Sequence, residues 1–152
     1  MIRRTKIHLI AILLLASCGF KPIYSDKESN FYLSKIEATG ETAINNQIVS
    51  NLKIYKNKKN KKNRFTINLN SSKTKDIVAK DSKGNASTFK IIIKSKVIII
   101  KKGKIKNEKE FATEFNYNNS DKKFELKQYE KNIQENLTDK LIEQITLYLY
   151  DN

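Results

Sequence analysis

The segment from Ser87 to Lys101 constrains the fold most, because its side chains alternate in character over the length of a long strand. One face carries Phe89, Ile91, Ile93, Val97 and Ile99, and the opposite face carries lysines together with Ile92, Ile98 and Ile100. A two-residue period predicts a β-strand with one buried face. Because 97–100 is apolar on both faces, we expect either an exposed binding surface or a strand that is locally covered on both sides.

Three other segments have the same two-residue period. They lie at 31–36, at 65–69 with a weak continuation at 77–79, and at 111–117. In the first of them, Phe31, Leu33 and Lys35 would share a face. Asp81 to Asn85 and Lys102 to Lys104 predict the turns between the later strands, and Gly40 predicts the end of the first.

Two segments have a helical period instead. Apolar residues recur between 41 and 56 at Ile44, Ile48, Leu52 and Tyr55, and between 121 and 150 at Tyr129, Ile133, Leu137, Leu141, Ile145 and Leu149. Thr39 or Thr42 could cap the first helix. The order β-α-β-β-β-α predicts an α+β two-layer domain, with a four-stranded, mainly antiparallel sheet and both helices packed on one face.

The N-terminus has the features of an export signal with a lipid attachment site. Arg3, Arg4 and Lys6 precede an apolar stretch at 7–16, which is too short to span a bilayer. Leu15, Ala16, Ser17 and Cys18 then match a bacterial lipobox, in which small residues suit the signal peptidase and the cysteine accepts the lipid. We therefore expect a signal peptide at 1–17, a tether lipidated at Cys18 over 18–30, and one domain over 31–152.

The mature chain would lack the side chains that most catalytic sites need. The sequence has one His, one Cys, one Met and no Trp, and all three single residues lie in the first 18 positions. Metal sites built from His or Cys and catalytic relays that use His are therefore excluded. Glu108, Glu110 and Glu114 could form a carboxylate site in an anchored hydrolase, but their spacing is typical of the solvent face of a strand. We expect no enzyme activity, no metal and no cofactor.

The formal net charge of +14, from 30 basic and 16 acidic residues, indicates anionic partners. The candidate phosphate-binding residues are a basic run and a second group near the later turn: Lys56, Lys58, Lys59, Lys61, Lys62 and Arg64, then Lys101, Lys102 and Lys104. The first group is expected to form a loop. The alternative is that these lysines are solvated loop residues in a chain with a lysine-rich composition. An exported protein would meet little nucleic acid, so nucleic acid is not an expected partner.

Cys18-Gly19-Phe20-Lys21-Pro22-Ile23-Tyr24 resembles the start of the mature chain in the LptE family of lipopolysaccharide (LPS) assembly lipoproteins. The resemblance implies a fold of two helices against a four-stranded sheet. It also implies a lipoprotein anchored on the periplasmic side of the outer membrane, which plugs a large β-barrel, the LPS translocon LptD, and assists its folding. Such a protein binds LPS and helps it enter the outer leaflet.

Only the role of Cys18 as lipid anchor can be carried over by this motif. The candidate LPS-phosphate residues come from charge alone. A second hypothesis keeps the anchor and the domain but places the protein in another envelope transport system, as an accessory or binding lipoprotein.

Overall fold

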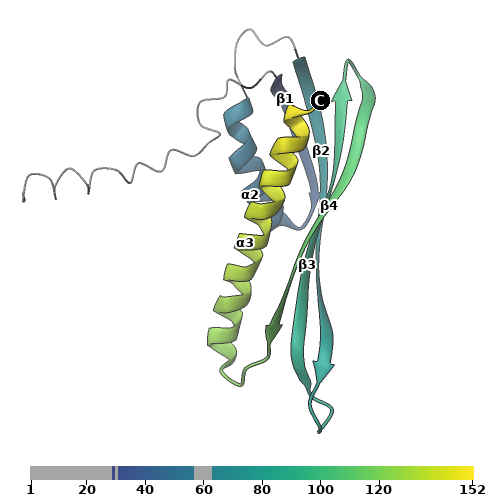
Figure 1. The fold of residues 1–152 in the computed structure, drawn as a ribbon. Helices are drawn as coiled ribbons and strands as arrows, with labels where there is room; N and C mark the ends of the chain where they lie inside the picture. The colour runs from purple at the N-terminus through teal and green to yellow at the C-terminus, as the bar shows by residue number, and fades with distance from the viewer. Residues whose placement is uncertain (1–28, 30, 57–62) are drawn as a thin grey trace, which may run out of the picture.

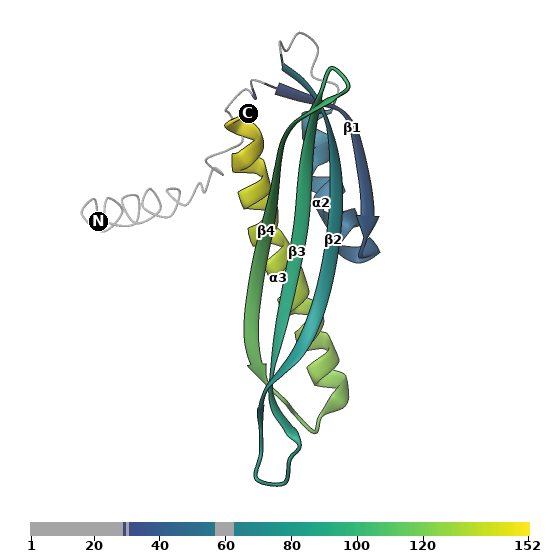
Figure 2. The same cartoon turned by 90° about the vertical axis from the view of Figure 1, so that its right-hand side faces the viewer.

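The computed structural model describes residues 29, 31–56 and 63–152, which form one two-layer domain. The elements are β1 (Phe31–Gly40), α2 (Thr42–Leu52), the 3-10 turn η1 (Lys53–Tyr55), β2 (Asn63–Lys80), β3 (Ala86–Lys101), β4 (Lys104–Asn118) and α3 (Lys123–Tyr150). Both helices lie on one face of the sheet, which is elongated along the strands (Figures 1 and 2). The predicted fold class and element order are confirmed.

The strands lie side by side in sequence order, β1-β2-β3-β4. β2, β3 and β4 form two antiparallel hairpins, whereas β1 pairs with β2 in parallel. A parallel neighbour requires the chain to cross back over the sheet, and α2 makes this crossing. The sheet is therefore mainly antiparallel, with one parallel pair at an edge.

β1 is much shorter than the strand beside it. It has 10 residues and pairs only with 63–71 of β2, which has 18 residues. The second half of β2 therefore has β3 as its only partner strand among the described residues. Below the end of β1, the β2–β3 hairpin continues past the start of α3 (Figure 1).

The core lies between the sheet and the helices. The apolar faces predicted for β3 and for both helices are buried there, including Ile93, Val97 and Ile99 of the sheet and Leu141 and Ile145 of α3. This burial explains why the two-residue and helical periods are so regular in the sequence. Among residues 29, 31–56 and 63–152, no helix combines the length and the apolar content needed to cross a bilayer.

Gly40 ends β1 in a conformation that other residues rarely adopt. Its φ is +91°, and a Cβ at this position would lie 1.9 Å from the backbone oxygen of Ser71. That oxygen accepts a hydrogen bond from the backbone N–H of Glu41 at 2.9 Å. Glycine therefore lets the chain leave the sheet against β2 and enter α2 within two residues.

Several local predictions are wrong for identifiable reasons. The register between β1 and β2 shifts between Leu33 and Lys35, so Ile36 packs against the core and Lys35 is exposed. A β-bulge of this kind reverses the alternation that the sequence predicts. Thr39 donates a hydrogen bond to the backbone oxygen of Leu69 at 3.2 Å and does not cap α2, whose N-cap residue is Glu41, without a side-chain cap.

Candidate functional site

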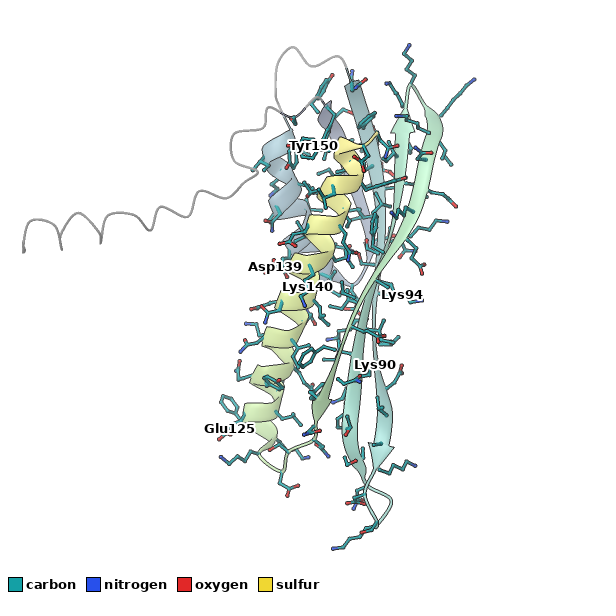
Figure 3. All side chains as sticks on the ribbon, in the orientation of Figure 1. Lys90, Lys94, Glu125, Asp139, Lys140 and Tyr150 are labelled. Carbon is teal, nitrogen blue, oxygen red and sulfur yellow. The ribbon has the colours of Figure 1, made fainter. Side chains whose placement is uncertain are left out.

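Four elements, β1, η1, β2 and α3, meet at one end of the elongated domain, where β1 and β2 begin and α3 ends (Figure 1). Aromatic rings form the contact between these elements. The ring of Phe31 lies 5.2 Å from that of Tyr55, 5.9 Å from that of Phe65 and 5.4 Å from that of Tyr150, measured between centroids. Figure 3 shows Tyr150 at this end of α3. Burial, with a contribution from Tyr150, raises the pKa of the Tyr55 phenol.

Basic side chains surround this aromatic cluster. Seven of them lie in three short segments, 53–56, 63–66 and 101–107, which contain no Asp or Glu. We call them the basic end: Lys53, Lys56, Arg64, Lys101, Lys102, Lys104 and Lys106. None forms an ion pair with an Asp or Glu side chain in the part of the chain that the structure describes. Lys106 Nζ donates to the backbone oxygen of Asn152, and the other six charges are available to an anionic partner.

The aromatic cluster also positions part of the basic end. Lys101 Nζ and Lys106 Nζ lie 5.5 Å and 5.4 Å from the ring centroid of Phe65, within the range of a cation–π contact. Lys101 Nζ also donates to Asn63 Oδ1 at 3.0 Å. β2 and the β3–β4 hairpin are thereby joined on the helix side of the sheet.

Two of the predicted phosphate-binding residues line one pocket on the opposite, open face of the sheet. The pocket has a volume of about 360 Å³, and its lining residues are Ser34, Arg64, Thr66, Ile100, Lys102 and Gly103. The guanidinium carbon of Arg64 lies 6.0 Å from the ring centroid of Tyr32. Hydroxyl groups and two cations on one small pocket are groups that bind phosphate oxygens.

The structure changes the setting of several predicted residues. Arg64 belongs to β2 and not to a loop, and Lys104 is the first residue of β4 and not part of the turn. Lys102 and Gly103 form the turn, with φ values of 53° and 77°. Lys58, Lys59, Lys61 and Lys62 lie outside the described residues, as do Leu15, Ala16, Ser17 and Cys18 of the lipobox.

The three glutamates considered for catalysis form ion pairs with lysines across the open face. Glu108, Glu110 and Glu114 of β4 lie 3.1, 3.5 and 3.2 Å from the amino groups of Lys96, Lys94 and Lys90 of β3. Figure 3 shows Lys94 on the side of the sheet away from α3. The half-buried side chains of Ile92, Ile98 and Ile100 share this face, and no described helix covers it. No group of acidic, His or Cys residues suited to a metal ion occurs in the described ranges.

The sequence did not predict a groove between β4 and α3. Phe115 and Tyr129 were expected in the core, but they are 43% and 47% exposed. They line a pocket of about 350 Å³ together with Ile133, Leu137 and three polar residues of α3. β4 lies at one edge of the described sheet, so no described strand lies beyond it to cover Phe115 and the neighbouring Tyr129 of α3. The position of β4 in the sheet, which a single sequence does not reveal, was the missing information.

A polar contact holds the opposite half of α3 to the sheet. Glu130 of α3 accepts hydrogen bonds from Lys75 of β2 and from the hydroxyl of Tyr117 of β4, both at 2.6 Å. Burial would raise the pKa of Glu130, but these two hydrogen bonds and the nearby lysine charges outweigh it and lower the pKa. The same contact, after burial, raises the pKa of Tyr117. Glu130 is therefore an ionised link between three elements.

No protein-family model and no curated protein matches the sequence. Solved structures do match. The chain shares its fold with rare lipoprotein B from Shewanella oneidensis, with a TM-score of 0.53 and 11% identity, over 75% of this chain and 95% of that one.

Two other bacterial lipoproteins are similar. The minor lipoprotein from Acinetobacter baumannii gives a TM-score of 0.62 at 14% identity, over 82% of this chain and 92% of that one. An uncharacterized lipoprotein B from Nitrosomonas europaea gives 0.58 at 13% identity, over 78% and 84%. At these identities the similarity establishes the fold and leaves the function to be argued from the residues.

Proposed function

We propose that this protein is an outer-membrane lipoprotein subunit of the LPS translocon. It is anchored through Cys18 on the periplasmic side, plugs and helps to assemble a β-barrel partner similar to LptD, and assists LPS on its way to the outer leaflet. Arg64 and Lys102 would contact an LPS phosphate. This role requires no catalysis.

The observation that carries the proposal is the agreement between the N-terminal motif and the fold. The seven residues from Cys18 to Tyr24 resemble the LptE family, and that resemblance implies two helices against a four-stranded sheet. The domain has this architecture, and the solved proteins that share it are lipoproteins. Two parts of the chain that do not overlap in sequence therefore favour the same family.

The surface of the domain is consistent with a partner that surrounds it. The sheet has an open face on which lysines and glutamates are paired across strands, and half-buried isoleucines lie between them. The groove between β4 and α3 leaves Phe115 and Tyr129 accessible on a second side. Such a domain has several surfaces with both polar and apolar groups, as a protein enclosed by a larger partner requires.

The pocket beside Arg64 and Lys102 is the best candidate for an LPS phosphate. It combines two cations with the hydroxyl groups of Ser34 and Thr66. Ser34 donates to the backbone oxygen of Phe65 at 2.8 Å, so Thr66 is the donor in the 3.1 Å hydrogen bond between the two hydroxyl groups. A bound phosphate would compete with Ser34 for the Thr66 proton. Changing both Arg64 and Lys102 to Gln should weaken LPS binding and reduce its salt dependence. Unchanged binding would remove this pocket from the proposal.

The test of the function is an affinity purification of the tagged, lipidated protein from detergent-solubilised envelopes, followed by mass spectrometry. We expect a large outer-membrane β-barrel in near-stoichiometric amount. Recovery of inner-membrane transporter components, or of no partner, would favour an accessory lipoprotein of another envelope transport system. Incorporation of labelled palmitate that is lost in Cys18→Ala tests the anchor separately.

A further inference from the structure

The two ends of the domain differ in charge. The basic end has seven cations in three segments with no acidic residue. The opposite end, which we call the distal end, comprises the β2–β3 turn region, 76–85, and the start of α3, 118–125. These two segments contain four lysines and four acidic residues: Lys80, Lys83, Lys122 and Lys123, with Asp76, Asp81, Asp121 and Glu125. The end of α3 adds one acidic residue, Asp151, to the basic end. The positive charge of the domain is thus concentrated at the end that has seven basic residues and few acidic neighbours.

Exposed aliphatic side chains accompany the lysines of the basic end. Ile105 lies between Lys104 and Lys106 at the start of β4, and Ile54 lies next to Lys53 in η1. Both isoleucines are 65% exposed. Aliphatic residues flanked by lysines suit a lipid–water interface, where the aliphatic group enters the acyl boundary and each ammonium stays among the headgroups.

The basic end already has a defined conformation, so binding to a lipid surface would not require a disorder-to-order transition. Lys102 and Gly103 both have positive φ, which is typical of a two-residue type I′ turn between two strands. The aromatic contacts of Phe31 with Tyr55 and Phe65 fix η1 and β2 beside β1. The cations are therefore spread over a rigid end of the domain, and they do not converge on one pocket alone.

We propose that, before a barrel encloses the domain, the basic end rests on the anionic phospholipid headgroups of the membrane that holds the Cys18 lipid, so that the domain stands with its distal end away from that membrane. The proposal rests on the proposed lipid anchor. Phe31, the first residue of β1, lies at the basic end, 13 residues after Cys18. Such a tether can span up to about 45 Å, so it keeps the domain near the membrane without fixing its orientation. The cations would supply the orientation.

The number of basic residues sets how strongly the membrane favours the orientation with the basic end on its surface. Each basic residue close to an anionic membrane surface strengthens binding about fivefold at physiological ionic strength. Removing four lysines should therefore lower the ratio of molecules with the basic end on the membrane to those in other orientations by roughly 600-fold. High salt should have a similar effect, because the Debye length falls to about 3 Å at 1 M.

The experiment measures orientation in the full lipidated protein. A fluorophore is attached through Asn107→Cys near the basic end or through Ser82→Cys in the distal turn. The lipidated Cys18 has no free thiol, so the label is site-specific. Energy transfer to a headgroup acceptor is recorded in vesicles of phosphatidylethanolamine with phosphatidylglycerol, and in vesicles of phosphatidylcholine. We expect strong transfer from position 107 and weak transfer from position 82, in the anionic vesicles only.

Two variants of equal net charge provide the control. One is K101Q/K102N/K104Q/K106Q, in which Asn suits the positive φ at position 102. The other removes the four distal lysines, K80Q/K83Q/K122Q/K123Q. The first should abolish the difference between the two labels and the second should preserve it. If the first misfolds by circular dichroism, the graded loss in Lys104→Gln and in Lys106→Gln decides the same question.

Three results would overturn the proposal. Equal energy transfer from both labels in anionic vesicles would mean that the basic end does not contact the membrane. Equal loss in both four-lysine variants would mean that only net charge matters. Transfer that appears only when LPS is added would make the basic end an LPS site and not a membrane contact. A failure to purify with a barrel would leave these results unaffected, and so would concern the translocon role alone.

Discussion

The basic end has six lysines and the distal end has four, and the two ends are held together by different forces. At the basic end, aromatic rings from η1, β2 and α3 pack on the buried Phe31, and the surrounding cations form no ion pair with an Asp or Glu side chain among the described residues. Toward the distal end, an ionised Glu130 joins α3 to two strands, and lysines are balanced by acids. The placement of the acidic residues, more than the abundance of lysine, therefore produces the difference in charge between the two ends of the domain.

Removing the central ring of the basic end should have the largest effect. Phe31 is fully buried, so Phe31→Ala removes a large side chain from between three other rings. We expect the free energy of unfolding to fall by about 4 kcal/mol, measured by urea denaturation. Phe124→Ala is the matched control, because that ring is 76% exposed near the distal end and should cost less than about 0.5 kcal/mol. Similar losses in both variants would contradict the assignment of the aromatic core to one end.

The junction between the two halves should tolerate no side chain at Gly40. Gly40→Ala would place a Cβ against the backbone oxygen of Ser71 in addition to straining a positive φ, so we expect a loss of about 3 kcal/mol in the same assay. Gly84 in the distal turn also has a positive φ, but open space surrounds its Cβ position. Gly84→Ala should therefore cost only about 1 kcal/mol from backbone strain. Equal costs would mean that the end of β1 can move away from β2.

The polar contact of the distal half should make stability depend on pH. Glu130→Gln should lower the free energy of unfolding by about 2 kcal/mol at pH 7, because it weakens two hydrogen bonds to a carboxylate. The pKa of Glu130 is lowered in the folded state, so its stabilisation is complete above the ordinary carboxyl value of about 4.5. It is lost as the pH falls through the folded pKa.

The measurement is urea denaturation of wild type and Glu130→Gln from pH 7 down to pH 3. The difference between the two should shrink at low pH. Glu125→Gln serves as control, since that carboxylate is largely exposed beside Lys122 and should change stability little at any pH. A constant difference across the series would mean that the charge of Glu130 is not what holds α3.

The smallest expected effect is a gain in stability. Lys102 adopts a positive φ of 53° in the turn before Gly103, and Asn-Gly suits such a turn better than Lys-Gly. Lys102→Asn should raise the free energy of unfolding by about 0.5 kcal/mol while removing one cation from the basic end. Lys104→Asn removes the same charge from a strand and should be neutral or slightly destabilising. A loss in Lys102→Asn would indicate that the Lys102 side chain itself supports the hairpin.

The sequence predicts the parts of the fold that burial on one face determines. The alternation at 87–101 and the stripe from Ile133 to Leu149 are regular because every second or fourth side chain enters the same core. β2 was expected to be interrupted between 69 and 77, where its residues are polar. It continues because Ser72 to Ile77 pair with β3, and backbone pairing does not depend on apolar side chains.

The candidate site was predictable only in part. Charge alone pointed to Arg64 and Lys102, but their position on one pocket depends on the pairing of three strands. The bulge after Leu33 and the exposure of Phe115 and Tyr129 depend on which strands lie at the edges. Local periodicity does not contain this information, because edge and register are properties of the assembled sheet.

The parallel pairing of β1 also has a consequence for the order in which the domain folds. The β2–β3 and β3–β4 hairpins start from turns, where Lys80 pairs with Ala86 and Lys101 pairs with Lys104, so each can form outward from its turn with little loss of chain entropy. The first residue of β1 pairs with Asn63, 32 positions later, and β1 has no strand partner until β2 exists. Contacts of long sequence separation form late. We therefore expect β1, the first strand to be synthesised, to join the sheet last, and its docking then completes the aromatic cluster around Phe31.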